Sequence, residues 1–217
     1  MTSSGDRALV ILGAGGHAAV VAEAAVRAGW RICGIASRDK PTDDGPFAGA
    51  EWLGDPDGDD ACARLAAERA RGAMLHAAVG DAQTRERWFG AHGGAGGFAS
   101  VIDPSAIVSR SARIGRGVFI GTGAVVHARA VVEDGAIVNT RSVVEHDSVV
   151  GSFAHVSPGA VLCGGVRVGA SAQVGAGAVV IPTRVIGERA TVGAGAVVVR
   201  DVADGVTAVG VPARALA

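Results

Sequence analysis

A six-residue pattern of hydrophobic positions runs without interruption through the second half of the chain, from Ile102 to Val198. The first position of each repeat is a branched aliphatic residue, the second is often glycine, and the fifth is small or of modest size in every repeat except the one that contains Arg184. The first positions are Ile102, Val108, Ile114, Ile120, Val126, Val132, Val138, Val144, Val150, Val156, Leu162, Val168, Val174, Val180, Ile186, Val192 and Val198.

This period excludes an α-helix and predicts stacked coils of short strands. Six residues do not divide into turns of about 3.6 residues in a way that keeps one stripe of a helix inside. Short strands joined by turns instead place one aliphatic side chain per repeat in the interior, with a small residue at the neighbouring inward position. Stacked coils then bury ladders of valine and isoleucine, as in other solenoids. A chain with 34 glycines, 4% aromatic residues and no tyrosine suits such an interior.

The first hundred residues follow a different pattern, in which strands and helices alternate. A strand over Ala8–Leu12, a glycine turn, a helix over Ala18–Ala28 and a strand over Arg31–Ala36 form a βαβ unit. The other expected elements are helices over Ala61–Arg71 and Ala82–His92, strands over Ala73–Val79 and Gly97–Ile102, and a mobile loop over Asp39–Asp60. The sequence therefore predicts a Rossmann-like α/β domain over residues 1–101 and an all-β domain over residues 102–217.

Charge and cysteine content exclude several classes of protein. The 217 residues carry 20 Lys and Arg against 21 Asp and Glu, so the basic surface of a nucleic-acid-binding protein is missing. No stretch reaches the roughly 18 apolar residues of a membrane span, and the first apolar run is too short for a signal peptide. Cys33, Cys62 and Cys163 lack the spacing of a zinc site or a disulfide framework. We therefore expect a cytoplasmic protein without a metal.

The glycine turn after the first strand is a candidate phosphate site. Gly13, Gly15 and Gly16 precede the start of a predicted helix, where free N–H groups and the helix dipole favour an anion. His17 follows them, and it either caps the turn, contacts a phosphate or is a surface histidine without a role. Three interpretations of the glycines remain. They bind a nucleotide diphosphate, they allow tight packing of the strand against the helix, or they belong to a relaxed dinucleotide fingerprint.

The end of the second strand bears on the dinucleotide interpretation. Ser37 and Arg38 stand where NAD would require an acidic residue, so NADP is the only dinucleotide compatible with the sequence. A half-sized Rossmann unit followed by a solenoid leaves no place for a hydride acceptor, whereas a nucleotide diphosphate needs only this half. The nucleotide diphosphate is therefore the preferred interpretation.

The repeat contains a histidine between two acids, His146 with Glu145 and Asp147 on either side. A carboxylate beside an imidazole holds one tautomer and makes the ring a better proton acceptor, which the deprotonation of an amine or alcohol requires. The alternative is a solvated turn of a charged repeat. Cys163 has no base within a few residues, so the sequence favours direct transfer over an acyl-enzyme.

The repeat and several local motifs resemble the hexapeptide-repeat acyltransferases, and within them the bacterial acetyltransferases that modify amino sugars on nucleotides. The segments that carry the resemblance are Gly13–His17, Ala78–Asp81, Asn139–Asp147, Phe153–Ala160 and Gly210–Arg214. It implies a left-handed parallel β-helix, assembled as a homotrimer with active sites between neighbouring subunits. The family includes N-acetyltransferases of UDP- or GDP-linked 4-amino-4,6-dideoxy sugars of the bacillosamine and perosamine type, and O-acetyltransferases of the sialic acid type.

By this resemblance, His146 is the general base that takes a proton from the sugar amine as the amine attacks acetyl-CoA. Asp147 is expected to tune it by position, although relatives often carry glutamate there, and Glu145 is the alternative partner. His155 is expected to contact acetyl-CoA, or else is an ordinary outward histidine. Because eighteen residues return the chain to the same face, further CoA contacts are expected at Gly164, Ala176, Gly193 and Ala194.

The resemblance also implies a nucleotide-sugar site in the first domain. Gly13, Gly15 and Gly16 are assigned to the diphosphate, Gly80 to the nucleoside and Asn139 to the sugar pocket. Relatives place an acid pair after the second strand, where this chain has Ser37 and Arg38. That difference indicates either a guanine in place of a uracil or an arginine contact to phosphate.

The prediction is an acetyl-CoA-dependent N-acetyltransferase that acts on a GDP- or UDP-linked 4-amino sugar, as used in glycans such as lipopolysaccharide O-antigen. One alternative is O-acetylation of a free sugar of the sialic acid type, and another is a non-catalytic β-helix that binds sugar or serves as a scaffold. A neutral amine is already nucleophilic, so a single base suffices, whereas an alcohol requires concerted proton removal.

Overall fold

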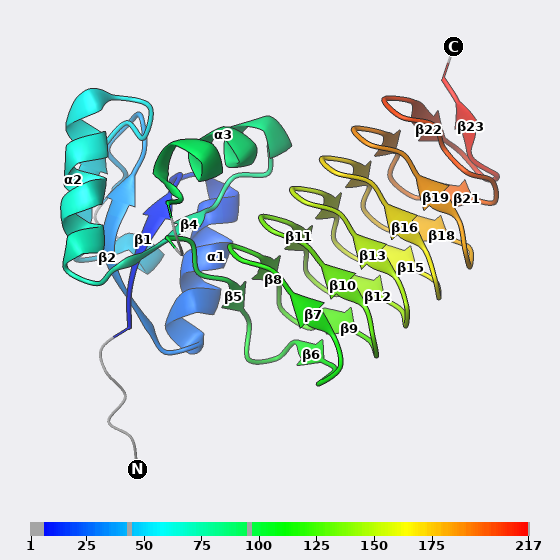
Figure 1. Ribbon diagram of the computed structural model, residues 1–217, viewed down its shortest axis with the longest axis horizontal. Coiled ribbons are helices and arrows are strands. Elements are labelled where there is room, and N and C mark those ends of the chain that lie inside the picture. The colour runs from blue at the N-terminus through cyan, green and yellow to red at the C-terminus, as the bar shows by residue number, and fades with distance from the viewer. Residues whose placement is uncertain (1–6, 43–44, 95–96, 217) are drawn as a thin grey trace. The chain divides into compact units, whose positions relative to one another are not determined.

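The computed structural model describes residues 7–42, 45–94 and 97–216. The chain divides into two compact units, residues 1–104 and residues 105–217. The first alternates strands and helices, and the second consists of short strands joined by turns (Figure 1). Within the described residues, no helix is both long and apolar enough to cross a bilayer.

The first unit is a Rossmann-like α/β arrangement, as predicted. Its elements are β1 (Arg7–Leu12), α1 (Gly16–Arg27), β2 (Trp30–Ala36), the short 3-10 helix η1 (Gly45–Phe47), β3 (Glu51–Gly54), α2 (Asp59–Ala70), β4 (Met74–Ala77), α3 (Ala82–His92) and β5 (Val101–Ile102). The first four strands form a parallel sheet in the order β3-β2-β1-β4. The order reverses between β1 and β4, and ligands of open α/β sheets bind beyond the carboxyl ends of the strands at such a switch point.

Alternating side chains of β1 pack against helices. Val10 and Leu12 lie in one buried cluster with Leu65 of α2 and Trp88 of α3. Helix α1 packs against β1 and β2. The central strand is thereby fixed, and the turns that follow it at the carboxyl edge rest on a rigid base.

Two expectations about this unit are wrong. The segment Asp39–Asp60 is not one loop, because β3 lies within it and pairs in parallel with β2; residues 43–44 of the segment are outside the described part of the chain. Burial of Leu53, which is 2% exposed, and a hydrogen bond from Trp52 Nε1 to the Ser37 carbonyl (3.1 Å) hold β3 in place.

The expected strand over Gly97–Ile102 is also shorter than predicted. Only Val101–Ile102 is a strand, while Phe98 makes an isolated parallel bridge to Leu75 at the edge of the sheet. The side chain of Phe98 is buried and stacks on Phe89 of α3, so packing rather than strand pairing accounts for its hydrophobic pattern.

The second unit is a parallel β-helix with three sheets, one strand per sheet in every coil (Figure 1). The first sheet holds β8 (Phe119–Ile120), β11 (Ile137–Val138), β14 (His155–Val156), β17 (Gln173–Val174), β20 (Thr191–Val192), β22 (Thr207–Val209) and the antiparallel β23 (Arg214–Ala215). The second holds β6 (Ile107–Val108), β9 (Val125–Val126), β12 (Val143–Val144), β15 (Val161–Leu162), β18 (Val179–Val180) and β21 (Val197–Val198). The third holds β7 (Arg113–Ile114), β10 (Val131–Val132), β13 (Val149–Val150), β16 (Arg167–Val168) and β19 (Val185–Ile186).

The predicted register is confirmed. The second residue of each short strand from β5 to β21 is the first position of a repeat, and from Ile120 to Val198 these side chains are buried. Strand partners such as Val131 and Val149 are one coil apart, which is consistent with the triangular left-handed β-helix implied by the resemblance. The coils therefore stack residue on residue.

Every turn of the β-helix from Gly117 to Gly195 has a positive φ at the fourth position of the repeat. Glycine occupies that position in about half of the repeats, since it adopts the left-handed conformation without steric cost. In the others the position holds Arg129, Arg141, Asp147, Phe153, Ser171, Thr183 or Arg189. The backbone at Asp147 is thus set by the repeat, with a φ of 61°.

Candidate active site

The turns after β1 and β4 meet at the switch point of the first unit. The backbone N–H of Gly13 donates to the Ala36 carbonyl at the end of β2 (2.8 Å), and that of Ala78 donates to the Leu12 carbonyl (2.8 Å). Gly13 has a φ of 111°, and a Cβ there would lie 3.0 Å from the Ala78 oxygen and from Val79 Cγ1. Both its conformation and its close contacts require glycine, so tight packing accounts for Gly13.

Packing does not account for Gly15, Gly16 or Gly80. A Cβ added at any of the three would meet no protein atom within 4 Å, and none of them has a positive φ. Gly15 caps α1 without a side-chain hydrogen bond, and the first turn of this fully described helix contains no acid. By contrast, α2 begins with two aspartates and α3 is capped by Asp81. The N–H groups at the start of α1 are therefore suited to an external anion.

The other residues expected near the nucleotide have different environments. His17 is half-buried in the first turn of α1. Ser37 is 8% exposed, and its hydroxyl donates to the Asp39 carbonyl (2.7 Å), so it supports the local chain. Arg38 extends into solvent with its side chain 85% exposed, and its Nε lies 3.8 Å from Asp55. Of these three, Arg38 is the most accessible to a ligand.

Arg85 of α3 is a buried residue that the sequence analysis did not single out. Its Nη1 donates to the carbonyl oxygens of Val79 (3.0 Å) and Gly80 (2.7 Å), directly in the turn after β4. Burial lowers the pKa of Arg85 to about 10, which still leaves it protonated at neutral pH. A charge on this helix therefore fixes the conformation of the turn that contains Gly80.

His146 and Asp147 lie in the turn between β12 and β13, and their side chains touch. His146 Nδ1 is 2.8 Å from Asp147 Oδ2. Hydrogen bonds from Arg129 and from His146 hold the pKa of Asp147 far below its ordinary value, so this carboxylate is ionised and accepts the bond. Nδ1 must then carry the proton, which leaves Nε2 with the lone pair of a general base.

Glu145 does not contact the imidazole in the same way. Its carboxylate accepts a long hydrogen bond from the backbone N–H of His146 (3.4 Å) and lies 3.6 Å from His127 Nε2, one coil earlier. Asp147 is therefore the partner of the His146 ring, and Glu145 is its neighbour in the turn.

Gly164 lies directly against His146, one coil later. A Cβ at Gly164 would be 2.7 Å from the Cε1 atom of the imidazole and 2.8 Å from Nε2. The backbone N–H of Gly165 donates to the His146 carbonyl (2.9 Å), which holds the two turns together. The absence of a side chain at position 164 thus makes room for the imidazole.

The residues expected along one CoA groove lie at two different corners of the β-helix, so the stacking argument for the full set is wrong. Gly164 follows the second sheet with His146, whereas Ala176, Gly193 and Ala194 follow the first sheet. Ala176 and Ala194 do stack, since the Gly195 N–H donates to the Ala176 carbonyl (2.8 Å). The error arises because Gly164 and Ala176 differ by two repeats instead of the three that complete a coil.

His155 and Asn139 come together at that other corner. His155 points outward from β14, and its Nε2 is 3.1 Å from Asn139 Nδ2 in the turn after β11. The two were expected to serve different ligands, acetyl-CoA and sugar. Their contact makes them one polar group at the edge of the first sheet.

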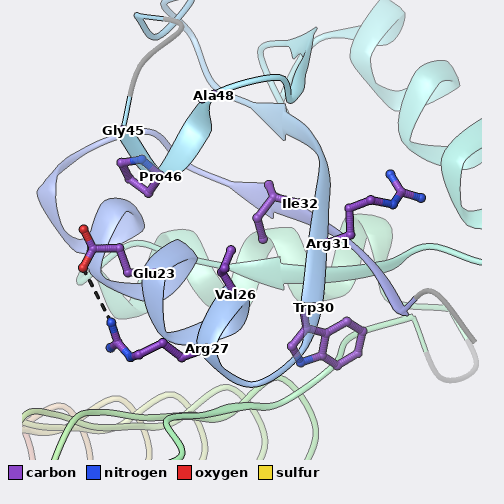
Figure 2. A pocket seen from close by; sticks show the side chains of 9 residues that line it. All are labelled: Glu23, Val26, Arg27, Trp30, Arg31, Ile32, Gly45, Pro46 and Ala48. Carbon is purple, nitrogen blue, oxygen red and sulfur yellow. Dashed lines mark ion pairs between the residues drawn. The ribbon is translucent and has the colours of Figure 1, made fainter. Parts of the chain in front are cut away.

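A cavity of about 680 Å³ in the first unit contains none of the expected residues. It lies by the C-terminal end of α1, where Val26, Trp30 and Pro46 line it and Glu23 pairs with Arg27 (Figure 2). Gly13–His17 lie at the opposite end of that helix. Among the described residues, no group of three or more His, Cys, Asp or Glu side chains is arranged to hold a metal ion.

Comparisons with known proteins agree with this geometry. The family model of the PglD N-terminal domain matches residues 8–91. PerB from Caulobacter crescentus, solved in complex with CoA and GDP-perosamine, is 38% identical, and the match covers 99% of both chains with a TM-score of 0.85. The acetyltransferase domain of PglB from Neisseria gonorrhoeae FA1090, solved with acetyl coenzyme A, is 37% identical over 98% of this chain and 100% of that chain, with a TM-score of 0.85. The chain belongs to the hexapeptide-repeat sugar acetyltransferases.

Other solved structures give narrower information. WeeI from Acinetobacter baumannii AYE is 22% identical over 97% of this chain and 100% of that chain, and its TM-score of 0.79 establishes the shared fold. Two variants of the Caulobacter crescentus enzyme, in which one histidine is replaced by asparagine or by alanine, were also solved with CoA and GDP-perosamine. A search of curated protein sequences gave no match.

Proposed function

We propose that this protein transfers the acetyl group of acetyl-CoA to the 4-amino group of a nucleotide-linked 4-amino-4,6-dideoxy sugar. The observation that carries the proposal is the contact of 2.8 Å between His146 Nδ1 and the ionised Asp147, which directs a basic Nε2 away from the carboxylate. Support also comes from PerB and from the PglB domain, which were solved with CoA and GDP-perosamine and with acetyl coenzyme A.

In the proposed reaction the sugar amine attacks the thioester carbonyl while Nε2 of His146 takes a proton from the amine. The C–N bond forms, the C–S bond breaks, and CoA leaves as the thiol after the imidazolium returns the proton. Asp147 stabilises the imidazolium and keeps the ring in one orientation. No acyl-enzyme is required, and Cys163 takes no part.

The first unit is proposed to bind the nucleotide sugar. The N–H groups of Gly15 and Gly16 would receive the diphosphate at the start of α1, and Gly80 would allow the nucleoside to approach the turn after β4. Arg38 is proposed to contact the phosphate or the base. Ser37 would act indirectly, because its hydroxyl bonds to the neighbouring backbone.

The second unit is proposed to bind acetyl-CoA and to assemble as a homotrimer with shared active sites. The outward residues of the second sheet are all branched aliphatics, namely Ile107, Val125, Val143, Val161, Val179 and Val197. An apolar face of this kind favours contact with another copy. His146 follows β12 at the edge of this face, so a neighbouring copy would bring its own corner, with His155, Ala176, Gly193 and Ala194, toward it.

The compartment and pathway belong to the same proposal. The structure describes Cys33, Cys62 and Cys163 as free thiols, which fits a reducing cytoplasm. The acetylated nucleotide sugar would then supply a glycosyltransferase of glycan assembly.

A thiol-release assay with acetyl-CoA and a panel of acceptors tests the proposal. We expect CoA release with GDP- or UDP-linked 4-amino sugars, and a loss of roughly 100-fold or more in kcat for His146→Asn, since general bases contribute about 10²–10⁴-fold. Reaction with free neutral sugars alone would instead establish O-acetylation. Full activity of His146→Asn would exclude His146 as the base.

A further inference from the structure

Asp147 is held by a second side chain from the preceding coil. Arg129 lies in the turn after β9, eighteen residues before Asp147. Its Nε donates to Asp147 Oδ1 (2.6 Å) and its Nη2 donates to Asp147 Oδ2 (2.8 Å), a two-point contact between guanidinium and carboxylate. Such bidentate pairs fix the plane of the carboxylate as well as its position.

The contact engages both oxygens of the Asp147 carboxylate. Oδ2 receives Arg129 Nη2 and also faces His146 Nδ1, so one oxygen joins the arginine to the histidine. The backbone of both residues is set by the repeat, with φ values of 60° at Arg129 and 61° at Asp147. Gly164 closes the arrangement on the other side of the imidazole.

We propose that Arg129 is a positioning residue of this active site, which holds Asp147 in the orientation that fixes the imidazole of His146 and offsets the charge of the carboxylate. The inference rests on the proposed function, because it gives Arg129 a role through the general base. Arg129 need not touch either substrate.

The charges around the imidazole define the second part of this role. Asp147 and Arg129 form the ion pair nearest to His146 Nδ1. Glu145 and His127 lie at the same corner of the β-helix. Cys163 lies in the turn one coil later, eighteen residues after Glu145. With Arg129 present, the carboxylate orients the ring without a full uncompensated negative charge beside it.

The β-helix provides a matched control at another corner. Arg116 and Asp134 are also eighteen residues apart and form a similar pair, with Nε and Nη2 of the arginine donating to Asp134 Oδ2 (3.0 and 2.6 Å). No histidine is adjacent to Asp134 in the sequence. Arg116→Met therefore removes an equivalent surface ion pair without touching the proposed site.

The experiment compares Arg129→Met, Arg129→Lys and Arg116→Met with the wild type in the full chain. We expect Arg129→Met to lower kcat at least tenfold, with little change in the KM for acetyl-CoA. Arg129→Lys keeps the positive charge but loses the two-point contact of the guanidinium, so its kcat should fall less than that of Arg129→Met. Arg116→Met should retain activity within about twofold, because surface pairs contribute little to stability.

Histidine NMR gives a readout that does not depend on turnover, with the His146 signals assigned by their loss in His146→Asn. We expect the Nδ1–H tautomer in the wild type, and a mixture of tautomers in Arg129→Met. An unchanged tautomer in Arg129→Met would overturn the inference, even if the enzyme is active. The absence of acetyl transfer by the wild type would overturn the proposed function and leave the NMR result to decide the role of Arg129.

A double variant separates positioning from any independent role. If Arg129 acts only through Asp147, then Arg129→Met combined with Asp147→Asn should be no slower than Asp147→Asn alone. Additive losses in the double variant would contradict the proposed chain of contacts.

Discussion

At the scale of single residues, the candidate site is a column of neighbours one coil apart. Counting eighteen residues back from Asp147 gives Arg129, and counting eighteen forward from His146 gives Gly164. Both could have been found from the register alone, because stacking places residues of successive coils in contact. The sequence made His146 and Asp147 candidates by their chemistry and by the family resemblance, but it did not indicate which neighbouring side chains reach them, since that depends on rotamers.

Substitution of Gly164 by alanine tests the space that the imidazole occupies. The added methyl group would lie within 3 Å of His146 Cε1 and Nε2, so the ring must turn away from Asp147. We expect kcat to fall at least tenfold while the thermal unfolding midpoint changes little, because Ala128, Ala170, Ala176 and Ala194 hold the same position in other repeats. Enzyme assay and thermal scanning measure both effects, and full activity would contradict the geometry.

At the scale of secondary structure, long periodic segments were predicted well and short ones were not. Helix α3 was placed correctly at both ends, since Asp81 caps it and its side chain accepts the Thr84 N–H (2.8 Å). Strand β3 was missed because its four residues lie in a segment rich in glycine, proline and aspartate. What makes it a strand is pairing with β2, a tertiary contact that local preference does not contain.

Strand β4 contains a buried histidine that predicts acid sensitivity. His76 is 1% exposed with Nδ1 2.9 Å from the Ala99 oxygen, and burial lowers its pKa to about 4. In the unfolded chain the pKa of His76 is about 6.5. Below that pH the unfolded state therefore binds a proton at His76, whereas the folded state binds it only near pH 4. The free energy of unfolding should therefore fall by about 3 kcal/mol as the pH drops from about 6.5 to about 4.

Urea unfolding of the wild type and of His76→Gln at several pH values measures this effect. Glutamine keeps a hydrogen-bond donor but does not titrate, so the variant should lose less stability between neutral pH and pH 4. Burial also lowers the pKa of His92, which contributes in the same direction to both proteins. Equal pH dependence in the two would show that His76 is not the source.

At the scale of the whole molecule, the fold follows from the sequence more completely than the site does. The six-residue register specifies every coil, because each buried aliphatic ladder has only one way to face inward. The proposed completion of the site by another copy of the chain is different, since one sequence does not state how copies meet. The expected CoA residues lie at two different corners of one chain, and the sequence does not state how copies of the chain bring such corners together.

The proposed trimer makes a prediction about the second sheet. Val161 lies in the middle of its outward aliphatic column, and a charge there would be buried without a partner on association. We expect Val161→Asp to be monomeric by light scattering and to lose most of its activity. Val185→Asp, on the third sheet beside Arg167 of the neighbouring strand, should remain assembled and active. A trimeric Val161→Asp would argue against this face as the interface.

The regular coil also fixes the position of the proposed general base along and around the β-helix. An insertion of eighteen residues before His146 would lift the base by one rung, about 4.8 Å, and return it to the same edge of the prism. An insertion of six would carry it a third of the way around, to an edge with different neighbours. Changes in length that preserve this chemistry are therefore restricted to whole rungs, whereas the composition of each rung is free to vary.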